Sequence, residues 1–270
     1  MKITEDRFKG VIIELPDEEI NEKSFEEELK RTWQSGKQLE SAASGFTCLT
    51  ERTRPLLICY KTDSVNIYPQ VQSVLYNPEY HHAKKGKVVL LGWLPTDDTN
   101  NVPAYPYTGI GVGGLVINSN NQVLMVKEKY AFSEYFKLPG GHVDKGEDLH
   151  IAAIREVKEE TGIDAKFKGI VQFRHFHDMP IEGHFCSDIY FIILLEPEDE
   201  TQTIKIQANE IQCAQWINIE DALSGNSVSE HNKGFIKAAR ECLESNTFIN
   251  IRKEEAFERV FSMWSIKNDS

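Results

Sequence analysis

Residues 141–163 read GHVDKGEDLHIAAIREVKEETGI, and this stretch decides the fold of the half of the chain that contains it. Its pattern predicts a helix from about Glu147 to Thr161, because acidic and apolar residues recur there at helical spacing. Gly162 stands where a helix ends in the left-handed conformation, and the apolar Ile163 follows it, as in a Schellman-type cap. We therefore expect one amphipathic helix with a defined C-terminus.

One face of the predicted helix is acidic. Glu156, Glu159 and Glu160 stand at positions i, i+3 and i+4, which share a helical face. Like charges so placed repel one another, and cations would relieve the strain. Carboxylate oxygens suit Mg²⁺ or Mn²⁺, ions that polarise phosphoryl oxygens and lower the pKa of a bound water. The opposite face carries residues suited to packing on a sheet, namely Ala153, Ile154 and Val157.

Strands are predicted on both sides of this helix. Gly109–Ile117 and Val123–Lys127 are joined by a turn-forming Asn118–Asn121, and Phe136–Leu138 leads to Pro139-Gly140-Gly141. The two glycines permit a tight approach of the backbone to a ligand just before the helix. Further strands are expected at 169–173, 189–195 and 212–217, and a closing helix is expected at 229–244.

A polar, turn-forming stretch at 95–105 separates this half from a first segment. Val11–Leu15, Pro55–Tyr60 and Val88–Trp93 read as strands in that segment. Helices are expected near 25–33 and 65–77, with a loop at 38–54. The boundaries expected are 1–97 for a small α/β domain, 98–105 for a linker, 106–250 for the second domain and 251–270 for a C-terminal extension.

Composition excludes several classes of function. A net charge of −12 over 270 residues repels polyanions, so broad nucleic-acid binding is not expected. Five separated cysteines without a C-x-x-C pair predict free thiols in a reducing compartment, which favours the cytoplasm without excluding the nucleus or an organelle. No signal sequence or membrane-spanning run of about 18 apolar residues is present, so no membrane partner is expected.

The helical motif resembles the signature of the Nudix hydrolase superfamily. That signature places Gly, Glu, Arg-Glu, an apolar residue, Glu-Glu, and Gly with an apolar residue at fixed spacing. The chain supplies all nine positions: Gly141, Glu147, Arg155, Glu156, Val157, Glu159, Glu160, Gly162 and Ile163. A solvated acidic surface helix is the competing interpretation, but nine specified positions are a poor fit to chance.

The resemblance implies a role for each matched residue. Glu156, Glu159 and Glu160 would be catalytic metal ligands, with one of them as a possible base, and Gly141 would add its carbonyl as a ligand. Glu147 and Arg155 would form a structural ion pair. Glu210, six residues before Trp216, is a candidate distal metal ligand or general base, and an ordinary surface acid is the equal alternative.

The implied fold is a Nudix α/β/α sandwich with a mixed sheet, preceded by the small α/β domain. The first segment resembles the domain before the Nudix domain in one subgroup, through Trp33 with Gly36, Tyr80-His81-His82-Ala83 and Trp93-Leu94-Pro95. That subgroup includes the animal antisense fibroblast growth factor protein and plant ADP-ribose/NADH pyrophosphatases. A homodimer is one assembly that this interpretation allows.

The resemblance implies Mg²⁺- or Mn²⁺-dependent cleavage of the pyrophosphate bond in a nucleoside diphosphate linked to another moiety. The small nucleotide substrate expected is ADP-ribose or NADH. The alternatives are a pyrophosphatase for modified nucleoside triphosphates and a regulatory nucleotide- or protein-binding module with weak turnover. RNA decapping is a third option, but the net negative charge of the chain and its lack of a basic stripe weigh against it.

Other patterns receive structural interpretations. Gly109–Gly114 matches G-x-G-x-x-G, but a strand follows where a dinucleotide site needs a helix, so close strand packing is expected. His175, His177 and His184 are expected to be ordinary strand or loop residues, and His81-His82 is expected to be structural. The aromatics before the motif, Tyr130, Phe132 and Tyr135, could stack on a base or anchor their own loop.

Overall fold

The chain divides into two units, Met1–Pro106 and Tyr107–Ser270. The computed structural model describes residues 2–5, 11–14, 39–40, 47–48, 56–60, 79–84, 87–92, 105–106, 108–130, 134–181, 184–256 and 259–266. The division falls just after the predicted linker at 98–105, and the independent folding of the two parts stays a prediction. Among the described helices, none is long and apolar enough to cross a bilayer.

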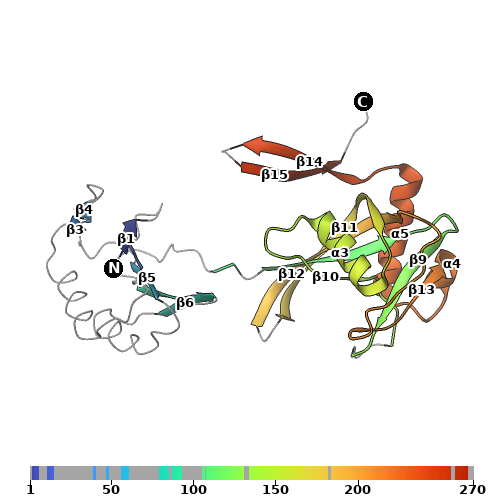
Figure 1. The fold of residues 1–270 in the computed structure, drawn as a ribbon, viewed down its shortest axis with the longest axis horizontal. Helices are drawn as coiled ribbons and strands as arrows, with labels where there is room; N and C mark the ends of the chain where they lie inside the picture. The colour runs from blue at the N-terminus through green and yellow to red at the C-terminus, as the bar shows by residue number, and fades with distance from the viewer. Residues whose placement is uncertain are drawn as a thin grey trace. The chain divides into compact units, whose positions relative to one another are not determined.

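A mixed six-stranded sheet forms the centre of the second unit (Figure 1). Its strand order is β10-β8-β12-β11-β14-β15, where β8 and β12 run parallel and the other neighbours run antiparallel. The strands span Thr108–Val116 (β8), Gly140–His142 (β10), Ala165–Ile181 (β11), His184–Pro197 (β12), Ile249–Ala256 (β14) and Arg259–Ile266 (β15). A second pair, β9 (Gln122–Glu128) and β13 (Ile211–Asn218), is antiparallel. The predicted mixed sheet is therefore confirmed.

Helices cover both faces of this sheet. Alternate residues of β8 enter different cores: Val112 and Val116 pack with α3 (Leu149–Thr161), whereas Leu115 packs with α4 (Ile219–Ser224) and α5 (Glu230–Ser245). The same alternation occurs in β12, where neighbouring residues enter opposite cores because side chains of a strand point to opposite faces. Figure 1 shows α3 and α5 on opposite sides of the sheet. The predicted α/β/α sandwich is the observed architecture of this unit.

The helix α3 ends as predicted at Gly162, but by a different cap. Gly162 has φ of 75° and its N–H donates to the Lys158 carbonyl at 2.9 Å. The Ile163 N–H donates to Thr161 Oγ1 at 3.3 Å rather than closing the second Schellman bond, so the cap is the simpler left-handed motif. The helix begins at Leu149, two residues later than expected, because Asp148 is the extended N-cap.

The glycines of β8 allow close packing, as the sequence predicted. A Cβ at Gly114 would overlap the Val157 side chain of α3, while Cβ atoms at Gly111 and Gly113 would come within 2.7 and 2.8 Å of Tyr190. The strand continues to Val116 and no helix follows it. The G-x-G-x-x-G pattern therefore reflects strand packing and is not a dinucleotide fingerprint.

Several other expectations need correction. The predicted strands at 169–173 and 189–195 lie within β11 and β12, which are far longer. The strand β10 and the helix α4 were not predicted, and residues 251–266, assigned to an extension, form most of the hairpin β14–β15. Most of these missed segments are short or mix charged with apolar residues. Neither the helical nor the alternating strand periodicity of apolar residues therefore stands out in them. The turn at Asn118–Asn121 is confirmed, with Asn121 at φ of 57°.

The first unit contains a five-stranded sheet with the order β1-β2-β5-β7-β6. The strands are β1 (Lys2–Glu5), β2 (Val11–Glu14), β5 (Leu56–Tyr60), β6 (Glu79–Lys84) and β7 (Lys87–Gly92). Three of them confirm the predicted strands, and the helices expected near 25–33 and 65–77 lie outside the described residues. The loop expected at 38–54 contains a small antiparallel pair, β3 (Leu39–Glu40) with β4 (Thr47–Cys48), which is a correction.

Candidate functional site

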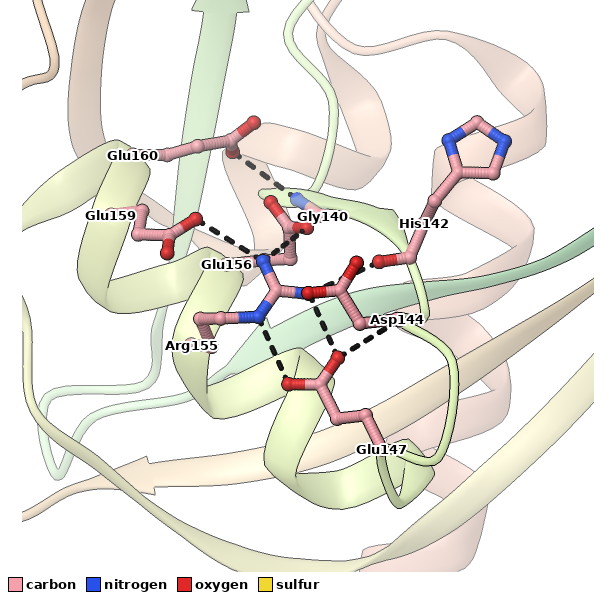
Figure 2. A network of polar contacts seen from close by, with 8 residues as sticks. All are labelled: Gly140, His142, Asp144, Glu147, Arg155, Glu156, Glu159 and Glu160. Atoms are coloured by element: carbon pink, nitrogen blue, oxygen red, sulfur yellow. Dashed lines mark hydrogen bonds and ion pairs between the residues drawn. The ribbon is translucent and has the colours of Figure 1, made fainter. Parts of the chain in front are cut away.

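Arg155 is the centre of a network that joins α3 to the loop before it (Figure 2). Its Nε and Nη2 donate to the two carboxylate oxygens of Glu147 at 2.9 and 3.0 Å, and Nη2 also donates to the His142 carbonyl at 3.1 Å. Glu147 in turn accepts the N–H of Asp144 at 3.0 Å. The hydrogen bonds from Arg155 lower the pKa of Glu147, so this bidentate pair stays ionised and closes the loop onto the helix.

The same guanidinium group also contacts the acidic face of the helix. Arg155 Nη1 donates to Glu156 at 2.8 Å and to Glu159 at 3.2 Å. The pKa of Arg155 is raised, first by its bonds to Glu147. From the sequence, Arg155 was expected to pair with Glu147 alone, and metal ions were expected to relieve the repulsion among the acids. In the structure, Arg155 already offsets part of that repulsion.

Glu160 has a different environment from its two neighbours. The residue is only 6% exposed, and its carboxylate accepts the backbone N–H of Gly140 at 3.1 Å. Burial raises the pKa of Glu160 to about 7, while the charge of Lys137 and the Gly140 bond oppose that rise. In the metal-free chain this carboxyl therefore occupies both protonation states near neutral pH.

The strand β10 lies directly against the acidic face because its first two residues are glycines. A Cβ on Gly141 would stand 2.7 Å from one Glu156 carboxylate oxygen, and a Cβ on Gly140 would overlap the Val112 carbonyl. Any side chain at position 141 would displace the carboxylate. Close backbone approach was predicted here for a ligand, and the structure adds a contact with the carboxylate itself.

Tyr190 supports β10 from the other face of the sheet. The positions of Cβ atoms on Gly113 and Gly140 lie 2.8 and 2.9 Å from its hydroxyl oxygen, so the ring fills the space that these glycines leave. The Arg174 guanidinium lies 4.8 Å from the ring centroid and forms a 3.5 Å ion pair with the buried Asp188. Asp188 thus helps to hold Arg174 against the ring of Tyr190.

The remaining candidates come from segments outside α3. Glu210 is exposed in the turn before β13, where its carbonyl accepts the Lys129 N–H at 2.7 Å. Within the described residues, no hydrogen bond or ion pair joins its carboxylate to the acids of α3. The rings of His175 and His177 pack on one another, 4.3 Å apart, on the exposed part of β11. Tyr130 and Tyr135 are exposed, and Phe132 and the His184 side chain lie outside the described residues.

The oxygen donors of the acidic face fit a hard divalent cation. Glu159 is half exposed, and Glu160 bonds a neutral N–H rather than a cationic side chain. In the described part of the chain, however, no three His, Cys, Asp or Glu side chains are already gathered around one point. The reason is that Glu156 and Glu159 bind Arg155 while Glu160 faces Gly140, so a cation would compete with Arg155 for its ligands.

Sequence reasoning missed three contributors to the site. The Gly140 N–H and the charge of Lys137 act on Glu160, and the ring of Tyr190 supports the strand β10. Gly140 had a signal, since two adjacent glycines mark a close backbone approach. Tyr190 and Lys137 had none, because their proximity depends on which strands are neighbours.

Comparison with known proteins agrees with the motif. Residues 108–238 match the NUDIX domain. Nudix hydrolase 8 of Arabidopsis thaliana is 40% identical over 146 residues, which cover 53% of this chain and 38% of that protein. Nudix hydrolase 2 of Arabidopsis thaliana is 38% identical over 149 residues, covering 54% and 51%. Nucleoside diphosphate-linked moiety X motif 6 of Xenopus laevis is 35% identical over 144 residues, covering 53% and 64%.

The similarity is concentrated in one domain. The chain spans about half the length of the curated relatives that it matches. The matched residues contain the acidic face of α3, the loop that Arg155 closes and the glycine strand β10. These residues therefore form a Nudix domain, and over this domain the chain is similar to Nudix hydrolases.

Proposed function

We propose that the chain hydrolyses the pyrophosphate bond of a nucleoside diphosphate linked to another moiety, with Mg²⁺ or Mn²⁺ as cofactor. The observation that carries the proposal is the acidic face of α3, where the buried Glu160 lies beside Glu156 and Glu159 and against the glycines of β10. A pure binding module has no need to keep three clustered acids. The relatives named Nudix hydrolase and nucleoside diphosphate-linked moiety X motif 6 support this reaction class.

The residues that would hold the metal are Glu156, Glu159, Glu160 and the Gly141 carbonyl. Nudix hydrolases use divalent metals, and such an ion would supply charge stabilisation on phosphoryl oxygens and a more acidic water. Arg155 would keep Glu147 as its anchor when Glu159 turns to the cation, because the Glu147 pair is bidentate. The loop before the helix therefore stays in place when the acids change partner.

A general base has two candidates in the chain. Glu160 is the first, if Glu156 and Glu159 alone hold the cation, because its buried carboxylate would then be uncoordinated beside the metal site. Glu210 is the alternative, because an exposed turn before β13 leaves its carboxylate free to approach a bound substrate. The pH dependence of kcat in Glu160→Gln and Glu210→Gln variants separates the two candidates. The variant whose kcat no longer falls at low pH has lost the base.

The substrate proposed is ADP-ribose or NADH. The first segment resembles the domain that precedes the Nudix domain in plant pyrophosphatases of that kind. A diphosphate between two bulky groups carries fewer charges than a triphosphate, which suits a chain with a net charge of −12. A modified nucleoside triphosphate and a regulatory binding role are the alternatives. The described cysteines, Cys186, Cys213 and Cys242, are free thiols, which supports a reducing compartment such as the cytoplasm.

The test is a substrate panel with a matched pair of variants. ADP-ribose, NADH, coenzyme A, dinucleoside polyphosphates and nucleoside triphosphates are compared by kcat/KM at equal Mg²⁺ or Mn²⁺. We expect Glu159→Gln to lower kcat by about 100-fold or more, whereas Glu241→Gln on the exposed side of α5 leaves it unchanged. A tenfold preference for triphosphates would replace the proposed substrate. Metal and nucleotide binding without turnover would favour the regulatory module.

A further inference from the structure

The terminal hairpin, β14–β15, reaches the start of the catalytic helix although it lies beyond the matched residues 108–238. Its two strands pair with each other along eight residue pairs, but β14 shares one pair with β11, Ile170 with Ile249. The backbone therefore attaches the hairpin to the sheet at one end. Further along the hairpin, side chains of Lys253, Ser262 and Trp264 contact α3.

The first contact engages the N-cap residue of α3. Asp148 is extended, at φ of −78° and ψ of 146°, and its side chain makes no capping bond to the helix. Instead one carboxylate oxygen accepts the Ser262 hydroxyl at 2.6 Å and the other forms an ion pair with Lys253. Lys253 also donates to Ser262 at 2.8 Å. Hydrogen bonds from Lys253 and then Ser262 lower the pKa of Asp148, which keeps this carboxylate ionised.

The second contact is aromatic and lies two residues further along the helix. The ring of His150, in the first turn of α3, lies 5.8 Å from Trp264 of the hairpin and 5.2 Å from Phe167 of β11. Phe167 and Trp264 meet edge to face at 6.1 Å. Both pack against the core cluster that contains Ala152, Ala153 and Val157 of the helix. The hairpin thus contacts the helix by a polar and an apolar route.

We propose that the terminal hairpin is a positioning element of the catalytic helix, acting through Asp148 on the acids at the other end of α3. The inference rests on the proposed hydrolase function. Asp148 directly follows Glu147, whose carboxylate binds Arg155 in bidentate fashion, and Arg155 binds Glu156 and Glu159. A shift of Asp148 therefore shifts the anchor that orients both acids.

The alternative role for the hairpin is a simple edge strand that adds stability. The two roles differ in what they predict for the acids. An edge strand that is lost or weakened lowers the melting temperature and leaves the active geometry of the folded molecules unchanged. A positioning element that is weakened lowers kcat at temperatures where every molecule is folded, because a small displacement of catalytic groups is costly to the rate.

The polar route is tested by Ser262→Ala in the full-length chain, with Ser262→Thr as the conservative rescue. Val260→Thr is the matched control, because Val260 lies on the same strand and is 69% exposed. We expect Ser262→Ala to lower kcat about fivefold or more with KM nearly unchanged. Ser262→Thr should restore most of that loss. An unchanged kcat for Ser262→Ala would overturn the inference.

A double-mutant cycle identifies Asp148 as the intermediary. If the hydroxyl acts through this carboxylate, Asp148→Asn combined with Ser262→Ala should cost no more in kcat than Asp148→Asn alone. Fully additive losses would overturn the route through Asp148. The aromatic contact between Trp264 and His150 is tested separately, by comparing the kcat of Trp264→Phe with that of Trp264→Ala.

Amide hydrogen exchange provides a readout that does not depend on turnover. Residues 152–156 make the first hydrogen bonds of α3, beginning with the Ala152 N–H to the Asp148 carbonyl. Their exchange should be faster in Ser262→Ala than in the parental chain and unchanged in Val260→Thr. If the parental chain cleaves none of the panel, the proposed function fails and exchange alone decides whether the hairpin positions the helix. Unchanged exchange would then overturn the inference.

Discussion

Replacement of Glu160 by glutamine should stabilise the folded chain at pH 8 when metal ions are removed by a chelator. Burial raises the pKa of this carboxyl from its ordinary value of 4.5 to about 7. A raised pKa means that the folded state binds the proton more tightly, so the favourable contribution is complete below the ordinary value and is lost as the pH rises through about 7. At pH 8 the folded chain therefore holds a buried, ionised carboxylate at a cost.

The size of that cost follows from the shift. Each pKa unit corresponds to about 1.4 kcal/mol, so the full penalty is about 3 kcal/mol at pH 8 and below about 1 kcal/mol at pH 5. Glutamine has no ionised form, and its oxygen can still accept the Gly140 N–H. The free energy of unfolding of Glu160→Gln minus that of the parental chain should therefore rise by about 2 kcal/mol between pH 5 and pH 8.

Urea unfolding at the two pH values measures this difference. Glu147, Asp148, His150 and His231 have lowered pKa values, which destabilise the chain as the pH falls, but they act equally in both proteins and cancel. Glu159→Gln is the matched control, because it makes the same substitution on the same helical face at a half-exposed side chain. A difference that is equal at pH 5 and pH 8 would refute the assignment of a buried, shifted Glu160.

Further outcomes follow from the same geometry. Gly162→Val should lower the free energy of unfolding by about 2 kcal/mol or more, because φ is 75° there and a Cβ would meet Lys205 at 2.9 Å; an unchanged melting curve would contradict this. Arg155→Lys should lower both the melting temperature and kcat, since an ammonium cannot make the bidentate bond to Glu147; wild-type values for both would contradict the anchor role. Tyr190→Phe should keep activity while Tyr190→Ala loses it, because the ring supports the glycine strand; equal kcat values would argue against that support. Residues 101–270 should fold alone, with a cooperative melting transition, and a molten fragment would contradict independent folding.

The boundaries of α3 could be predicted to within two residues because a helix and its caps depend on residues close in sequence. The acidic face and Gly162 are both consequences of local spacing. The hairpin β14–β15 could not be predicted in the same way. Its strands read INIRKEEA and RVFSMWSI, in which charged and apolar residues do not alternate cleanly. These strands join the sheet because β14 pairs with β11 and because side chains of the hairpin contact α3. Both β11 and α3 are distant from the hairpin in sequence.

The sequence by itself determined the family motif, the α/β class and the set of acids, because these depend on residue types at fixed local spacing. Only the tertiary structure decided how the acids differ. Glu160 is buried because β10 covers it, whereas Glu159 on the same face is half exposed. The pKa of a carboxyl depends on the solvent and charges around it, and those come from strands that are far apart in sequence. Helical spacing placed the three carboxylates on one face, but the packing of neighbouring strands gave each one its own environment.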